Sequence, residues 1–183
     1  MVKLIKDVRQ LMEKYVPDIY QKDIYNIKYK NLASRGIKLL IFDLDNTIAL
    51  INEWSPSEEA IKLFKKLNKS FEVIIASNSV KQRVKNFADT LGIKYLSHVK
   101  KPKGLPIEEY INNSKYNQSE IAMIGDSMMD DIVCGNRLGI TTILIDQLGK
   151  REYPLAYLRR RKERKIQKRL RDNNLFTKGR YYV

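Results

Sequence analysis

Short apolar runs alternate with helical patterns through the middle of this chain, and this alternation constrains the fold more than any other feature. Each run is rich in Ile, Val and Leu, and runs of this length are typical of buried strands. Five runs occur, at Ile37–Phe42, Glu72–Ala76, Lys94–Val99, Ile121–Ile124 and Thr141–Ile145. Helical patterns lie between them near 57–69, 79–91, 105–114 and 129–138. Strands that alternate with helices predict an α/β fold, a three-layer α/β/α sandwich with a mainly parallel, five-stranded sheet.

Few residue types are available for catalysis. The chain of 183 residues holds one cysteine, Cys134, and one histidine, His98. A single cysteine excludes an intrachain disulfide and indicates a reducing compartment, and the chain is long enough to bury a core without one. A single histidine argues against most zinc sites and against a Ser-His-Asp triad. Catalysis would therefore depend on carboxylates, hydroxyls and lysines.

The positive charge is concentrated at the two ends of the chain. Residues 1–35 hold 8 basic and 4 acidic residues, 36–149 hold 14 and 14, and 150–183 hold 13 and 3, so the net charge of +14 divides into +4, 0 and +10. We therefore predict a neutral catalytic domain between an N-terminal amphipathic helical segment and a basic C-terminal helix or tail. No run of about 20 apolar residues is present to span a bilayer, which favours a cytoplasmic protein.

Both ends contain helical patterns rich in basic residues. Residues 3–15 predict a helix that packs on the domain or lies in a membrane interface. Residues 154–172 predict a second helix, which carries Leu155, Leu158, Ile166 and Leu170 among Lys and Arg. This helix could lie on an anionic leaflet, where each nearby cation contributes about 1 kcal/mol. A solvated charge run and a nucleic-acid-binding tail are the alternatives, because a basic tail attracts any polyanion.

Polar residues follow the predicted strands where each one ends. Asp43 and Asp45 come directly after the first run, and two neighbouring carboxylates repel each other unless a cation holds them. Ser77 and Asn78 follow the second run at the start of a helix, where hydroxyls and backbone N–H groups can seat a phosphate oxygen. The later runs are followed by Lys100, Lys101 and Lys103, and by Asp126, Asp130 and Asp131. Because the carboxyl ends of parallel strands meet at one edge, a ligand site is expected there.

Four motifs in this order resemble those of the haloacid dehalogenase-like (HAD) phosphatase superfamily. They are DLDNT at 43–47, the hydroxyl of Ser77, Lys101 before a proline, and GDSMMDD at 125–131. The resemblance covers about residues 36–146 and implies a HAD-like Rossmannoid domain with Mg²⁺ as cofactor. A doubly wound domain whose acids hold only a structural cation is the alternative.

The resemblance also implies a role for each group. Asp43 would be the nucleophile that forms an aspartyl-phosphate, and Asp45 would protonate the leaving oxygen and then activate water. The implied metal ligands are Asp43, the backbone carbonyl of Asp45, Asp126 and Asp131. The implied phosphate-binding residues are Ser77, Asn78 and Lys101. Lys103 is the alternative to Lys101 as the lysine of the third motif. Asp130 is the alternative to Asp131 as the outer acid, which is the second acidic residue of the fourth motif. Thr47 is interpreted as a hydroxyl that supports the turn.

The spacing of the motifs leaves no room for the cap domain that many members of the superfamily insert. Only 32 positions separate Asp45 from Ser77, and 24 separate Ser77 from Lys101. Such a capless member, of subfamily III, would have a site open to a large substrate such as a lipid headgroup, a protein or a nucleic-acid end. Ile51 and Trp54, in the loop after the first motif, could line the entrance.

Further segments resemble the YqeG-type branch of the superfamily, which includes mitochondrial and bacterial phosphatidylglycerophosphate phosphatases. These segments are Val16–Tyr20, Gly36–Lys38 and Gly135–Gly139. The resemblance implies hydrolysis of phosphatidylglycerophosphate to phosphatidylglycerol, a step towards cardiolipin. With the two basic ends, it predicts peripheral contact with the inner face of an anionic membrane through 1–35 and 150–183. The alternatives are a HAD phosphatase acting on a nucleic-acid end or a phosphoprotein, and a non-catalytic HAD domain that binds nucleic acid.

Overall fold

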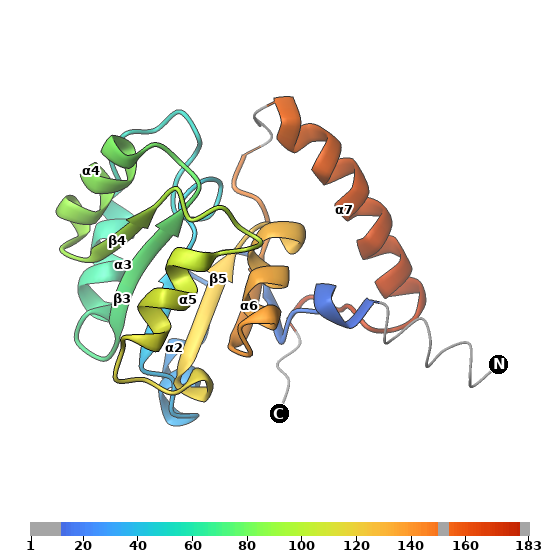
Figure 1. Cartoon of the computed structure of the whole chain (residues 1–183), viewed down its shortest axis with the longest axis horizontal. Coiled ribbons are helices and arrows are strands. Elements are labelled where there is room, and N and C mark those ends of the chain that lie inside the picture. Colours follow the sequence, from blue (N-terminus) through green and yellow to red (C-terminus); the bar gives the residue numbers. More distant parts are fainter. Residues whose placement is uncertain (1–11, 150–153, 180–183) are drawn as a thin grey trace.

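The protein folds around a six-stranded parallel sheet with helices on both faces (Figure 1). The structure is a computed structural model that describes residues 12–149 and 154–179. The strands lie in the order β1-β6-β5-β2-β3-β4, and each adjacent pair is parallel. Their bounds are β1 Ile19–Gln21, β2 Leu39–Phe42, β3 Glu72–Ser77, β4 Lys94–Ser97, β5 Ile121–Gly125 and β6 Thr141–Ile145. The predicted α/β class is confirmed.

Helices cover both faces of the sheet because successive residues of the central strands point into two different cores. In β2, Leu40 and Phe42 join the core beneath α3 and α4, whereas Leu39 and Ile41 join the core beneath α5 and α6. The described helices are α2 Tyr29–Ser34, α3 Glu58–Leu67, α4 Lys81–Leu91, α5 Leu105–Asn112, α6 Val133–Arg137 and α7 Pro154–Asp172. Three short helical turns are η1 Glu13–Tyr15, η2 Gln118–Glu120 and the π-turn η3 Met128–Ile132.

The sheet has one strand more than the predicted five. The additional strand, β1, comes from the N-terminal segment that the charge distribution separates from the domain, and it pairs with β6 at the edge of the sheet. Three residues are too few to show a strand periodicity, and they form a strand through their pairing with β6. Most of the predicted helix at 3–15 lies outside the described residues, and residues 13–15 form the 3₁₀ turn η1.

The basic C-terminal segment forms the predicted helix at 154–172, which is α7. Its apolar side packs on the domain: Ile166 and Leu170, with Phe176 beyond the helix, are buried against Met128 and Leu144. These two helix residues are therefore buried in the domain and are not exposed on the surface of α7. Figure 1 shows α7 standing beside the sheet, with its N-terminal end at the top of the molecule. No helix in the described part of the chain is both long and apolar enough to cross a membrane.

Candidate active site

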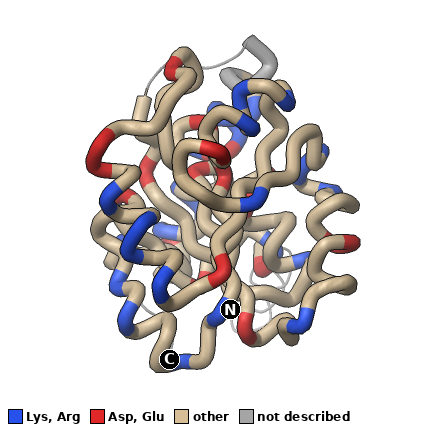
Figure 2. The backbone as a smooth tube through the Cα atoms, turned by 90° about the vertical axis from the view of Figure 1, so that its left-hand side faces the viewer, with Lys and Arg blue, Asp and Glu red and all other residues tan. Residues whose placement is uncertain are grey.

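The predicted site residues come together at the carboxyl edge of the sheet. A pocket of about 770 Å³ opens there, and its lining includes every residue in the predicted catalytic, phosphate-binding and metal-binding sets. These are Asp43, Asp45, Ser77, Asn78, Lys101, Asp126 and Asp131. In Figure 2, acidic positions lie close together in the upper half of the molecule. The motifs converge because β2, β3 and β5 are adjacent and parallel, so their ends share one edge.

Three buried carboxylates form the centre of this pocket. One oxygen from each of Asp43, Asp126 and Asp131 lies within 4.8 Å of the others. Burial raises the pKa of Asp43 to about 7, although Lys101 opposes this shift. Burial also raises the pKa of Asp126 well above its usual value, and Arg160 partly offsets that effect. Close carboxylates with raised pKa values favour a bound cation, and hard oxygen ligands fit Mg²⁺.

Lys101 provides the positive charge at the floor of the pocket. Its Nζ donates to a carboxylate oxygen of Asp43, to Asp131 Oδ1 at 2.7 Å and to the backbone oxygen of Ala76 at 3.0 Å. Burial lowers the pKa of Lys101, but Asp131 and Asp43 outweigh burial and raise the pKa above its usual value, so the side chain stays charged. The alternative, Lys103, is exposed. The geometry therefore favours Lys101.

The end of β3 contributes the hydroxyl and the amide expected at a phosphate site. Ser77 is buried, and its Oγ accepts a hydrogen bond from the backbone N–H of Ser79 at 3.1 Å. The Oδ1 atom of Asn78 accepts from the backbone N–H of Lys101 at 3.0 Å. Asn78 therefore connects the end of β3 to the loop that carries Lys101, and it positions that lysine as well as lining the pocket.

The side chain of Asp45 lies apart from the three carboxylates and contacts Arg83. The distance from Arg83 Nη1 to Asp45 Oδ1 is 2.5 Å. Burial raises the pKa of Asp45 despite this partner. Arg83 is buried and also donates to the backbone oxygens of Glu53 and Leu50, at 2.7 and 2.9 Å. Sequence reasoning missed Arg83, because one arginine on an amphipathic helix carries no sign that its partner lies 38 positions earlier.

Three charged side chains from α7 complete the wall of the pocket. Arg160 forms an ion pair with Asp126 and donates to the backbone oxygen of that residue at 2.8 Å. Glu163 is buried and accepts from the hydroxyl of Ser127 at 2.8 Å. Arg159 contacts both carboxylate oxygens of Asp130, at 2.6 and 2.8 Å. The sequence shows these residues only as part of a basic run, so nothing in it distinguished them from solvated charges.

The Asp130–Arg159 pair helps to choose the outer acid. Asp130 turns towards α7, whereas Asp131 is buried beside Lys101 and belongs to the group of three carboxylates. The geometry therefore favours Asp131. The Asp131 carboxylate can lie against the end of β5 only because residue 125 is a glycine. A Cβ added at Gly125 would overlap this carboxylate. Thr47 is fully buried, and its hydroxyl lies 3.5 Å from Asp126 Oδ1, in keeping with a supporting role in the turn.

Comparisons with known proteins find phosphatase relatives that match most of this chain. The family model of the mitochondrial phosphatidylglycerophosphate (PGP) phosphatases matches residues 1–148. "Probable phosphatase YqeG" of Bacillus subtilis is 30% identical over 153 residues, which cover 83% of this chain and 89% of that protein. The chloroplastic/mitochondrial phosphatidylglycerophosphate phosphatase 1 of Arabidopsis thaliana is 32% identical over 151 residues, which are 76% of this chain and 43% of that protein.

Solved structures share the fold at low sequence identity. A HAD family enzyme of Bacteroides thetaiotaomicron, solved with magnesium and inorganic phosphate, superposes with a TM-score of 0.50 at 15% identity, over 67% of this chain and all of that one. An uncharacterized protein of Listeria monocytogenes serotype 4b gives a TM-score of 0.51 at 18% identity, over 64% of this chain and 85% of that one. By the extent of the family match and the identity to YqeG, the chain belongs to the mitochondrial PGP phosphatase family.

Proposed function

We propose that this protein hydrolyses phosphatidylglycerophosphate to phosphatidylglycerol and inorganic phosphate, with Mg²⁺ as cofactor. The observation that carries the proposal is the position of Asp43 at the end of β2, within one buried group with Asp126, Asp131 and Lys101. Such a site matches the charge of a phosphomonoester once a divalent cation is bound. The family and its plant relative supply the lipid identity of the substrate.

The reaction would proceed in two displacements. A carboxylate oxygen of Asp43 bonds to phosphorus while the bond between phosphorus and the glycerol oxygen breaks, and the proton held by Asp45 passes to that oxygen. The ionised Asp45 then takes a proton from the water that attacks the aspartyl-phosphate and releases phosphate. Mg²⁺ held by Asp43, Asp126 and Asp131 would neutralise phosphoryl charge and favour the ionised form of Asp43.

The supporting residues act on charge and orientation. Lys101 is charged and lies on Asp43, so it would stabilise the phosphoryl oxygens as they approach this carboxylate. Burial raises the pKa of Asp45, which favours the protonated form that the first step requires. Arg83 holds the Asp45 carboxylate from one side and would leave it able to reach the leaving oxygen. The hydroxyl of Ser77 would bind a phosphoryl oxygen at the end of β3.

The substrate would be reached at a membrane surface. Peripheral contact of 1–35 and 150–183 with the inner face of an anionic membrane remains part of the proposal. What supports it is the charge of +14, with +10 in the C-terminal segment, because anionic lipids attract such segments. A basic protein with an open site could also act on a nucleic-acid end or a phosphoprotein, so the experiment must separate these substrates.

The test is phosphate release from phosphatidylglycerophosphate in mixed micelles, with Mg²⁺ or with EDTA. The wild type should release phosphate only with Mg²⁺, and Asp43→Asn should release none. Asp89→Asn is a matched control, because Asp89 forms an exposed ion pair with Lys85 on α4, and it should retain full activity. Metal-dependent hydrolysis of an aryl phosphate without hydrolysis of the lipid would refute the substrate. Full activity in Asp43→Asn would refute the nucleophile.

A further inference from the structure

The exposed large hydrophobic side chains of the described residues gather at one edge of the molecule. They are Trp54, Val80, Leu105, Leu148 and Leu158, with 54%, 54%, 65%, 43% and 64% of their surface exposed. Exposed hydrophobic side chains that are scattered singly over a surface are ordinary, but several at one edge indicate an interaction site. Four of these residues follow the carboxyl ends of β2, β3, β4 and β6, and the fifth lies near the start of α7. We call these five residues the apolar rim.

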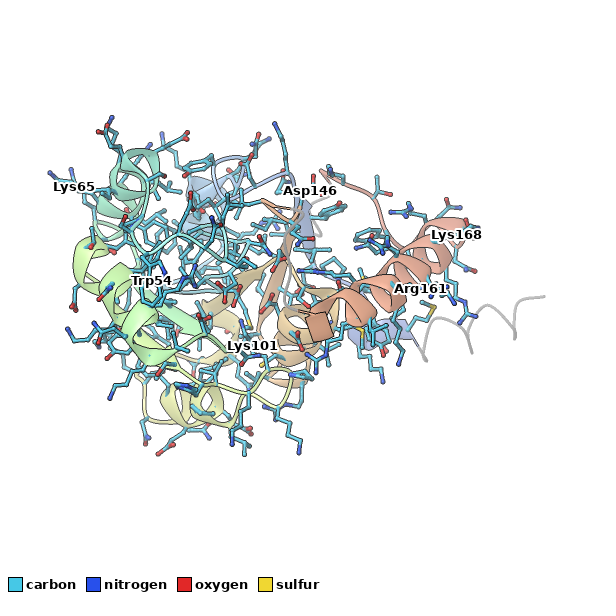
Figure 3. The ribbon with its side chains drawn as sticks, turned by 90° about the horizontal axis from the view of Figure 1, so that it is seen from above. Trp54, Lys65, Lys101, Asp146, Arg161 and Lys168 are labelled. Atoms are coloured by element: carbon cyan, nitrogen blue, oxygen red, sulfur yellow. The ribbon has the colours of Figure 1, made fainter. Side chains whose placement is uncertain are left out.

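The apolar rim lies at the same edge of the sheet as the active-site pocket. Val80 lines the pocket, as does Arg159, the neighbour of Leu158. The backbone N–H of Leu148 donates to the backbone oxygen of Asn46 at 3.0 Å, which joins its loop to the first motif. Figure 3 looks down on this edge and shows Lys101 between Trp54, on its left, and Arg161 of α7, further away on its right.

The loop that carries Trp54 is held firmly although its side chain is exposed. The buried guanidinium of Arg83 donates to the backbone oxygens of Leu50 and Glu53, on the turn that leads to Trp54. The Glu53 carboxylate accepts from the backbone N–H of Leu50 at 2.8 Å. The fold therefore presents an aromatic ring to solvent from a fixed turn. A tryptophan held in this way suits an interface that is apolar on one side and wet on the other.

Exposed cations accompany the apolar rim. Lys81 follows Val80, Lys103 precedes Leu105 by two positions, and Arg161 lies one helical turn from Leu158. The acidic groups nearest the centre, Asp43 and Asp126, are buried and engaged by Lys101 and Arg160. The exposed Glu53 also lies at this edge, where its carboxylate accepts the hydrogen bond from the backbone N–H of Leu50. The outer part of this edge therefore combines apolar side chains with these three cations, a composition that suits an anionic lipid surface.

We infer that the apolar rim is the docking surface for an anionic bilayer and that it seats the open pocket directly on the headgroup layer. The inference rests on the proposed function and deepens it, because it adds the active-site edge to the membrane contact proposed for 1–35 and 150–183. Trp54 and its neighbours enter the interface, while Lys81, Lys103 and Arg161 contact lipid phosphates. The scissile phosphate then meets Asp43 without leaving the membrane surface.

Trp54 makes this inference directly measurable, because it is the only tryptophan in the chain. The 183-residue chain is mixed with vesicles of equal parts phosphatidylglycerol and phosphatidylcholine, and with vesicles of phosphatidylcholine alone. On the anionic vesicles, Trp54 emission should shift to shorter wavelength and be quenched by lipids brominated near the headgroup. Vesicle binding with unchanged Trp54 emission would overturn the inference, because another surface would then hold the protein.

A double variant separates docking from catalysis. Leu105→Ser with Leu158→Ser removes two exposed side chains that do not line the pocket, so the fold should persist. Its vesicle affinity should fall by about tenfold or more, since burying even one leucine contributes at least that factor. Ala33→Ser, an exposed change on α2, is the matched control and should bind normally. Unchanged affinity of the double variant would overturn the inference.

The activity readout distinguishes failure of docking from failure of the proposed function. The double variant should hydrolyse a soluble aryl phosphate at the wild-type rate and lose activity on phosphatidylglycerophosphate in vesicles. If wild-type Trp54 inserts but the lipid is not hydrolysed, the proposed substrate is wrong while the docking surface stands. If the lipid is hydrolysed equally by wild type and double variant, the docking surface is wrong while the substrate stands.

Discussion

Arg160 contacts the carboxylate of Asp126, which is also a proposed ligand of the metal ion. Replacing Arg160 should therefore make the free energy of unfolding depend on Mg²⁺. Arg160 forms an ion pair with Asp126, whose side chain is only 3% exposed. Removing one partner of a buried ion pair costs about 3–5 kcal/mol. Arg160 retains 16% exposure, and the unpaired carboxyl can take up a proton, so we expect Arg160→Gln to lose about 2–3 kcal/mol of unfolding free energy in EDTA.

Saturating Mg²⁺ should restore most of this loss, because the cation would become the partner of Asp126. A recovery of about 2 kcal/mol corresponds to an affinity for Mg²⁺ about 30-fold tighter in the variant than in the wild type. Urea denaturation in EDTA and in Mg²⁺ gives the stability, and isothermal titration gives the affinity. Arg161→Gln is the matched control, since Arg161 is exposed on the same helix. Equal losses with and without Mg²⁺, or a loss no larger than that of Arg161→Gln, would refute this reasoning.

Three further predictions test the site and its supports. Gly125→Ala should displace Asp131, because the new Cβ overlaps that carboxylate, and should reduce kcat about 100-fold with an unchanged circular dichroism spectrum. Leu170→Ala, at a fully buried position of α7, should destabilise the protein by about 2–5 kcal/mol in urea denaturation. The hydrogen bond from Tyr110 lowers the pKa of Glu72, so its stabilising effect is present above the usual glutamate pKa and is lost as pH falls through the lowered value. Glu72→Gln should therefore flatten the acid side of the stability profile, measured by thermal unfolding; a steeper profile would contradict this sign.

The pattern of apolar and polar residues along the sequence was sufficient to predict most of the fold and the centre of the site. The alternation of apolar runs and helices predicts a parallel sheet, and parallel strands bring their carboxyl ends to one edge. Asp43, Ser77 and Asp126 each stand at the end of such a strand, so their convergence follows from topology alone. The choices between Lys101 and Lys103, and between Asp130 and Asp131, needed the structure, because neighbouring residues of one type differ only in the direction of their side chains.

The features that the sequence did not reveal depend on contacts between distant segments. β1 is a strand only because β6 offers it a partner, and three residues have no periodicity of their own. Arg83 and Arg160 meet Asp45 and Asp126 across 38 and 34 positions of chain. A charged residue in a sequence looks the same whether it faces water or a buried carboxylate, because its partner is chosen by packing. The strand and helix pattern by itself determined the chemistry available at the edge of the sheet, and only the tertiary structure decided which charges enclose it.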